Sequence, residues 1–157
     1  MAKATFAAGC FWGVEDAFAQ IKGIISTACG YTGGTLENPS YEDVCSGTTG
    51  HAEAVEVEFD PAQVSYRDLL AAFFRLHDPT TLNRQGPDVG KQYRSAIFFH
   101  DAQQEAAAHE VKAALEKAGV FRRPIVTEIT PASAFYRAED YHQKYFQKRG
   151  IQSCHLP

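Results

Sequence analysis

The sequence is poor in the features that mark several classes of protein. Its four cysteines form no CxxC pair, and 157 residues can build a core without disulfide staples, so we expect no structural zinc site. Fifteen Lys and Arg against nineteen Asp and Glu give a formal net charge of -4, which is too acidic for a protein that binds a phosphate backbone. No apolar run approaches the roughly 20 residues of a membrane span, and residues 1–8 lack the build of a signal peptide. We therefore expect a reducing, cytoplasmic location and neither nucleic acid nor a membrane as a partner.

The rest of the composition is typical of a soluble domain. Hydrophobic residues make up 45% of the chain and charged residues 22%. No internal repeat, charge block or low-complexity linker divides the sequence. We predict a single domain over residues 1–157, and no feature indicates an obligate oligomer, so we expect a monomer.

Hydrophobic periodicity alternates between that of strands and that of helices. The expected strands are 4–8, 24–31, 52–59, 95–100 and 125–129, and the expected helices begin at 11, after Ser65 and after Asp101, with a shorter one around 138–148. The order strand-helix-strand, followed by strand-helix-strand, is typical of the split βαβ plan. The sequence therefore predicts an α+β fold: a two-layer sandwich with a ferredoxin-like plait core, a mixed sheet and helices on one face.

Two connections are long enough to suggest a function. Residues 32–51 and 78–94 are rich in Gly, Pro, Thr and Asn, and they carry Tyr41, Asp88 and Tyr93. Long loops in compact domains are usually functional or disordered. Because these loops hold many hydrogen-bonding groups, we interpret them as a binding surface.

Cys10 is the strongest candidate for a nucleophile. It follows Gly9 at a predicted strand-to-helix junction, where free backbone N–H groups and the helix dipole favour a thiolate. We therefore expect a lowered pKa for Cys10. Phe11 and Trp12 follow it and suggest a pocket for a small apolar group, although Phe11 also fits the apolar stripe of the helix. The alternative is that Cys10 is a small buried hydrophobe.

Glu53 is the most informative carboxylate. In the expected strand 52–59 it has the same parity as Val55 and Val57, so it should face the apolar side of the sheet. Burial disfavours the charged form and should raise its pKa, which makes Glu53 a candidate proton donor at neutral pH. The alternative is a solvated or salt-bridged carboxylate at the mouth of the strand.

The six histidines form no spaced ligand set, so metal binding is not expected. A Cys-His hydrolytic dyad needs no proximity in sequence, and His51 or His142 is a possible partner for Cys10. This dyad is the main competing enzymatic hypothesis, and a noncatalytic ligand-binding domain is another.

Cys154 lies near the C-terminus, where chains are usually mobile, so its thiol is a plausible redox partner for Cys10. The alternative is an ordinary exposed thiol. Cys29 and Cys45 are interpreted as mostly structural.

A series of motifs resembles the A type of peptide methionine sulfoxide reductase. The motifs lie in the family's order along nearly the whole chain: GCFWG at 9–13, GYTGG at 30–34, NPSY at 38–41, VCSGTTGHAE at 44–53, HDPTTLNRQG at 77–86, DVG at 88–90, QYRS at 92–95 and AEDYHQ at 138–143. The resemblance implies thiol-dependent reduction of methionine S-sulfoxide, free or in oxidised proteins, to methionine. It also implies repair of oxidised proteins under oxidative stress, with no cofactor and with thioredoxin as the usual reductant.

The resemblance implies a role for each matching position. Cys10 matches the nucleophile that attacks the sulfoxide sulfur, and Glu53 matches the acid that protonates the oxygen. The positions matching the assisting tyrosines are Tyr41 and Tyr93. The substrate-binding positions are Asp88, which shapes the site, and Phe11 and Trp12, which form the aromatic wall around the methyl group.

The resemblance also bears on recycling. This chain has only Cys154 near its end, so the sulfenic acid on Cys10 is expected to be resolved as a Cys10–Cys154 disulfide. Residues 149–157 are then a mobile tail of the catalytic domain that carries the recycling cysteine. Cys29 matches no cysteine associated with that family position, and it is either core filler or an off-path partner of Cys10.

Overall fold

The computed structural model describes residues 2–145 and 148, and it contains a six-stranded mixed sheet. The strands are β1 (Ala2–Ala8), β2 (Ile24–Thr32), β3 (Ala52–Phe59), β6 (Ser95–Phe99), β7 (Glu128–Pro131) and β8 (Tyr136–Arg137). They lie in the order β7-β6-β1-β3-β2-β8; only β6 and β7 pair in parallel, and the other neighbours are antiparallel. The predicted mixed sheet is confirmed.

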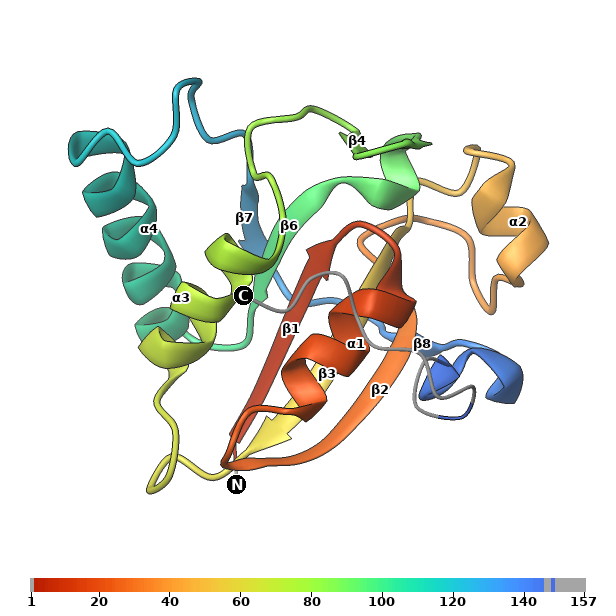
Figure 1. Ribbon diagram of the computed structural model, residues 1–157. Coiled ribbons are helices and arrows are strands. Elements are labelled where there is room, and N and C mark those ends of the chain that lie inside the picture. Colours follow the sequence, from red (N-terminus) through yellow and green to blue (C-terminus); the bar gives the residue numbers. More distant parts are fainter. Residues whose placement is uncertain (1, 146–147, 149–157) are drawn as a thin grey trace.

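Three helices share one side of this sheet. Helix α1 (Phe11–Ala19) lies across β1, β3 and β2 in Figure 1, and it contacts α3 (Tyr66–Leu76), which in turn contacts α4 (Ala102–Lys117). The main core lies between the helices and the sheet, where Phe6, Val55 and Ile97 point from neighbouring strands. A smaller cluster around Ala54 and Phe98 occupies the opposite face.

The helix starts follow the capping chemistry of the sequence. Ser65 caps α3 in a capping box with Asp68, each side chain binding the other residue's backbone N–H at 3.0 Å. Asp101 caps α4 by accepting from the Gln104 N–H at 2.8 Å. Both helix starts were predicted from these residues.

The two long connections contain short elements that the hydrophobic pattern did not reveal. The first holds α2 (Tyr41–Cys45), and the second holds a hairpin of β4 (Arg84–Gln85) and β5 (Asp88–Val89) followed by the 3-10 turn η1 (Lys91–Tyr93). The hairpin lies close to the end of β1, because a Cβ added at Gly9 would lie 2.8 Å from Cγ of Gln85.

Two sequence predictions near the end of the chain were wrong in detail. The strand expected at 125–129 begins only at Glu128, which pairs with Ala96. Before Glu128, Val126 donates its N–H to the Pro79 carbonyl at 2.8 Å, so residues 125–127 are not part of the sheet.

The helix expected around 138–148 is absent from its described first part, 138–144. That stretch holds only the 3-10 turn η2 (Asp140–His142), followed by Gln143 with extended backbone and Lys144 with φ 53°. Side-chain bonds to β2 replace helical bonds here: the Gln143 amide pairs with both backbone groups of Cys29 at 2.8 and 2.9 Å.

The tail predicted at 149–157, with Cys154, lies outside the described residues. Within residues 2–145 and 148, no helix is both long and apolar enough to cross a bilayer.

Candidate active site

Cys10 sits at the junction between β1 and α1. It is the N-cap of α1, and its carbonyl accepts the first helical bond from Val14 at 3.5 Å. Gly9 before it has φ +99°, and a Cβ at that position would lie 2.8 Å from Cγ of Gln85 on β4. The glycine therefore lets the β4–β5 hairpin approach the backbone beside the thiol.

The expected low pKa of Cys10 is wrong for the unliganded site. Burial, together with the charge of Glu53, raises the pKa of Cys10 from 9.0 to about 12. The backbone N–H groups of Trp12 and Gly13 at the helix start act in the opposite direction, and Asp88 adds to the rise. The helix N-terminus is present as predicted, but burial and two carboxyl groups outweigh it.

Glu53 faces the helix side of the sheet, as its parity with Val55 and Val57 predicts. It is 1% exposed, and its Oε1 accepts the backbone N–H of Phe11 at 3.3 Å, one residue after Cys10. Its Oε2 is buried and has no hydrogen-bond partner in the described part of the chain. Burial raises the pKa of Glu53 to about 8, with a further rise from Asp88 and an opposing effect of the Phe11 bond. The group is thus mostly protonated at neutral pH.

The second long connection brings Asp88 and Tyr93 to the same place. The charge of Asp88 raises the pKa values of Cys10, Glu53 and Tyr93, which places it within electrostatic reach of all three. Burial and the charge of Glu53 raise the pKa of Tyr93 to about 12, so its hydroxyl remains a donor at neutral pH.

The first connection contributes Tyr41 at the start of α2. Burial, and then a hydrogen bond to the Cys45 side chain, raise the pKa of Tyr41 well above its ordinary value. Its backbone N–H donates to Glu139 at 3.1 Å, which fixes the first turn of α2. Cys45, which was interpreted as mostly structural, is exposed.

Phe11 and Trp12 differ in exposure. Phe11 is 1% exposed and packs against Tyr31 and His142, with ring centroids at 5.7 and 5.2 Å, so it also belongs to the core. Trp12 is only half-buried; its ring stacks on Tyr145 at 3.8 Å, and its Nε1 donates to His142 Nδ1 at 2.9 Å. Three rings therefore pack against Phe11 and Trp12: Tyr31 from β2, and His142 and Tyr145 from the segment after β8.

Neither histidine proposed for a hydrolytic dyad is arranged as a base for Cys10. The ring of His51 accepts from the Gly34 N–H at 3.0 Å through Nδ1, and its Nε2 lies 2.7 Å from the Leu36 carbonyl. His142 is bound to Trp12, and its Nε2 has no partner among the described residues. His51 thus closes the first long loop, and His142 orients an aromatic ring.

Cys29 is part of the core. It is fully buried, its thiol donates to Glu15 at 3.1 Å, and burial followed by the charge of Glu15 raises its pKa well above the ordinary value. Glu15 is a buried carboxylate that sequence reasoning missed. Its helical spacing from Phe11 and Phe18, both in the apolar stripe of α1, could have revealed it.

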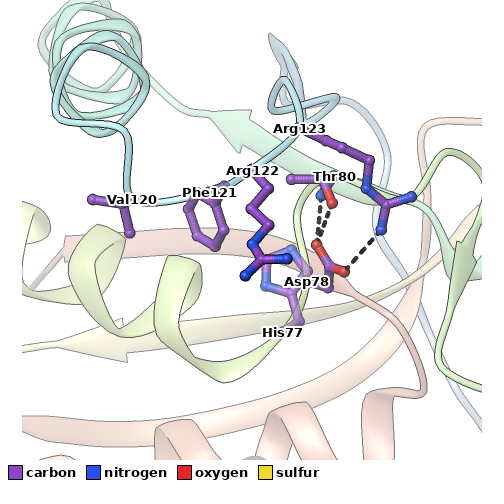
Figure 2. A pocket seen from close by; sticks show the side chains of 7 residues that line it. All are labelled: His77, Asp78, Thr80, Val120, Phe121, Arg122 and Arg123. Atoms are coloured by element: carbon purple, nitrogen blue, oxygen red, sulfur yellow. Dashed lines mark hydrogen bonds and ion pairs between the residues drawn. The ribbon is translucent and has the colours of Figure 1, made fainter.

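A cavity of about 500 Å³ lies elsewhere, between the end of α3 and the loop that follows α4 (Figure 2). Arg123 points toward Asp78 there and forms an ion pair at 3.9 Å, while Asp78 also accepts from the Thr80 hydroxyl at 2.6 Å. None of the candidate residues around Cys10 lines this cavity. Among residues 2–145 and 148, no group of three or more His, Cys, Asp or Glu side chains is placed to hold a metal ion.

The fold and site define a class: an α+β protein whose partly exposed cysteine caps a helix beside a buried, protonated carboxyl group. Comparison with known proteins shows which family of this class the chain resembles. The family described as "Peptide methionine sulfoxide reductase" matches residues 2–157. A peptide methionine sulfoxide reductase MsrA of Methanosarcina acetivorans is 66% identical over 149 residues, which cover 95% of this chain and 79% of the relative.

Solved structures agree with this similarity. Reduced Mxr1 from Saccharomyces cerevisiae superposes with a TM-score of 0.90 at 36% identity, covering 99% of this chain and 91% of that one. Mxr1 in complex with Trx2 gives a TM-score of 0.64 at 27% identity, covering 92% and 84%. The chain belongs to the peptide methionine sulfoxide reductase family, and it is an enzyme that reduces methionine sulfoxide.

Proposed function

We propose that Cys10 is the nucleophile of this reduction and that Glu53 is its proton donor. The observation that carries the proposal is the Oε2 atom of Glu53, which is buried and unbonded within the described chain. The other oxygen of this carboxyl group is fixed one residue from Cys10 by the Phe11 N–H. A carboxyl group that keeps its proton up to a pKa of about 8 needs an acceptor at Oε2, and a sulfoxide oxygen is one.

The raised pKa of Cys10 determines the path of the protons. At neutral pH the group is a thiol, so it must lose its proton as its sulfur bonds to the sulfoxide sulfur. Glu53 protonates the sulfoxide oxygen and takes up the proton from Cys10, so one proton moves from thiol to oxygen through the carboxyl group. Transfer of that hydroxyl to the Cys10 sulfur then breaks two bonds, the sulfur-oxygen bond of the substrate and the bond between the Cys10 sulfur and the substrate sulfur. Methionine leaves with two more electrons, and Cys10 becomes a sulfenic acid.

Tyr41 and Tyr93 are proposed to assist Glu53, and Asp88 to shape and bind the substrate site. Support for the tyrosines is their raised pKa values, which keep both hydroxyl groups protonated as donors toward a developing negative oxygen. Support for Asp88 is its charge, which raises the pKa values of both Cys10 and Glu53, so it lies within electrostatic reach of the thiol and of the acid.

Phe11 and Trp12 are proposed as the wall that holds the methyl group of the substrate. Trp12 is the more accessible of the two, and its ring is fixed from behind by Tyr145 and His142. With the methyl group on this wall and the oxygen at Glu53, one arrangement at sulfur is favoured. We infer specificity for the S epimer, in free methionine sulfoxide and in oxidised proteins.

Recycling is proposed to use Cys154 and thioredoxin. Attack of the Cys154 thiol on the sulfenic acid releases water and leaves a Cys10–Cys154 disulfide, which an external dithiol reduces by exchange. The relative solved with Trx2 supports a thioredoxin as that dithiol. Cys29 is an unsuitable alternative because its thiol is fully buried and bound to Glu15.

We also propose the finer features of the whole chain. The order β6-β1-β3-β2, with α1 and α3 on one face, supports the split βαβ, ferredoxin-like description of the core. Residues 1–157 form one catalytic domain in which residues 149–157 carry the recycling cysteine, and the protein is a cytoplasmic monomer that repairs oxidised proteins during oxidative stress. The net charge of -4 supports the absence of nucleic acid among its partners.

The variant Glu53→Gln tests the central proposal, because it should slow the reduction of methionine sulfoxide and speed the alkylation of Cys10. Reduction of methionine sulfoxide in a single turnover should slow by roughly 100-fold or more, since the proton donor is lost. Alkylation of Cys10 by iodoacetamide at pH 9, followed by mass spectrometry, should become faster because the charge that raises the pKa of Cys10 is gone.

The matched control is Glu58→Gln, a change on the same strand but on the opposite side of the sheet. It should change neither rate. Unchanged turnover in Glu53→Gln, or equal effects in both variants, would remove Glu53 from the mechanism.

A further inference from the structure

The aromatic wall of the site depends on a segment far away in sequence. After β8, residues 138–145 cross the edge of β2 and end with Tyr145 stacked on Trp12, with ring centroids 3.8 Å apart and planes within 9°. The indole of Trp12 therefore has its position set by where this segment places Tyr145.

A buried carboxylate holds that segment from the core side. Glu15 is 1% exposed and lies in α1, at the same end of the sheet as Trp12. Its Oε2 accepts the hydroxyl of Thr27 at 2.8 Å, and its Oε1 accepts the thiol of Cys29 at 3.1 Å. The same Oε1 also accepts the backbone N–H of Lys144 at 2.5 Å. One side chain thus joins α1, β2 and the segment after η2.

Lys144 has the backbone conformation that needs such support. Its φ is 53°, a left-handed conformation that costs a non-glycine residue conformational free energy. The bond from its N–H to Glu15 compensates for this cost. Just before it, the side chain of Gln143 bonds both backbone groups of Cys29. The turn is therefore fixed at two successive residues, and it directs Tyr145 back onto Trp12.

We propose that Glu15 is a positioning residue for substrate binding: by holding the left-handed turn at Lys144, it fixes the Tyr145–Trp12 stack and so the shape of the methyl pocket. Glu15 touches neither the substrate nor Cys10 in this role. The effect on substrate rests on the function proposed above for Trp12, whereas the effect on the stack does not.

The test uses Trp12, which is the only tryptophan in the chain and therefore the only source of indole fluorescence. In reduced Glu15→Ala we expect a red-shifted Trp12 emission, because the stack opens to water. We also expect KM for free methionine sulfoxide to rise about 10-fold, with kcat of the reductase step within about 2-fold, because binding rather than chemistry is lost. Glu15→Gln keeps an acceptor for the Lys144 N–H and should restore most of both properties.

Two changes at Lys144 keep the proposal testable if Glu15→Ala does not fold. Lys144 is exposed, and Lys144→Pro removes the N–H and imposes φ near -65°, so it should reproduce both effects. Lys144→Gly adopts a left-handed turn without strain, so it should partly rescue Glu15→Ala.

Thr27→Val is the matched control, because it removes a different bond to the same carboxylate. It should lower stability but leave the emission and KM unchanged. The proposal fails if folded Glu15→Ala or Lys144→Pro keeps the wild-type emission and KM, or if Thr27→Val changes both as much as Glu15→Ala. A shifted emission with unchanged KM would instead overturn the substrate role of Trp12.

Discussion

At the scale of the residue, the burial that keeps Glu53 protonated also makes the folded protein less stable as the pH rises. In the folded protein it keeps its proton up to a pKa of about 8, whereas in the unfolded chain it releases it near 4.5. Between these pH values the folded state binds more protons than the unfolded state, so stability falls as pH rises. The contribution lost by pH 9 amounts to roughly 5 kcal/mol, at about 1.4 kcal/mol for each unit of pKa difference.

Glu53→Gln should therefore stabilise the protein at pH 9 by up to several kcal/mol, and this gain should disappear near pH 4. Urea unfolding of the variant and the wild type across this range measures the difference. A constant difference across the range, or a less stable variant at pH 9, would show that the carboxyl group is not held protonated.

At the scale of the element, the close approach of the β4–β5 hairpin to the start of α1 sets the position of Cys10. Gly9→Ala should therefore slow the reductase step and lower stability, because its Cβ would contact Gln85 at a φ of +99°. Gly86→Ala is the control, since Gly86 also has a positive φ of +56° but has no atom within 4 Å of the added Cβ. It should cost only about 1 kcal/mol, with normal turnover. Single-turnover rates and thermal unfolding of both variants provide the comparison.

The elements differ in how well the sequence predicts them. β3 and the starts of α3 and α4 follow from local signals, namely strict alternation and side-chain caps. The helix expected around 138–148 does not begin at 138, because Glu139 and Gln143 bond to distant residues, which no local pattern records. Tertiary bonds replace helical ones there.

The residues of the site likewise include some that local sequence signals predict and some that they do not. The burial of Glu53 follows from its parity in the strand, and the place of Cys10 follows from its junction. The pKa of Cys10 does not follow from the sequence, because it depends on burial and on the charges of Glu53 and Asp88, which are 43 and 78 positions away in the chain. Motifs that resemble a known family supplied Tyr41, Tyr93 and Asp88, which periodicity alone would have left as loop residues.

At the scale of the whole molecule, the proposed recycling joins this site to Cys154, 144 positions along the chain. Cys154→Ser should still convert about one equivalent of the S epimer to methionine but should stop cycling with thioredoxin. The measurement is product formed from separated R and S epimers by reduced protein, with free thiols counted before and after. The wild type should lose two thiols per enzyme with the S epimer and none with the R epimer. Sustained cycling by Cys154→Ser would show that another thiol resolves the sulfenic acid.

The hydrogen bond between Trp12 and His142 also affects when the site can form during synthesis of the chain. It spans 130 positions of the chain, so the ribosome makes Trp12 well before it makes His142. Cys10 emerges early, but the wall beside it can form only after His142 and Tyr145 have emerged. A nascent chain thus carries its thiol before the binding site beside it is finished, and that wall is complete only once residues 138–145 have docked.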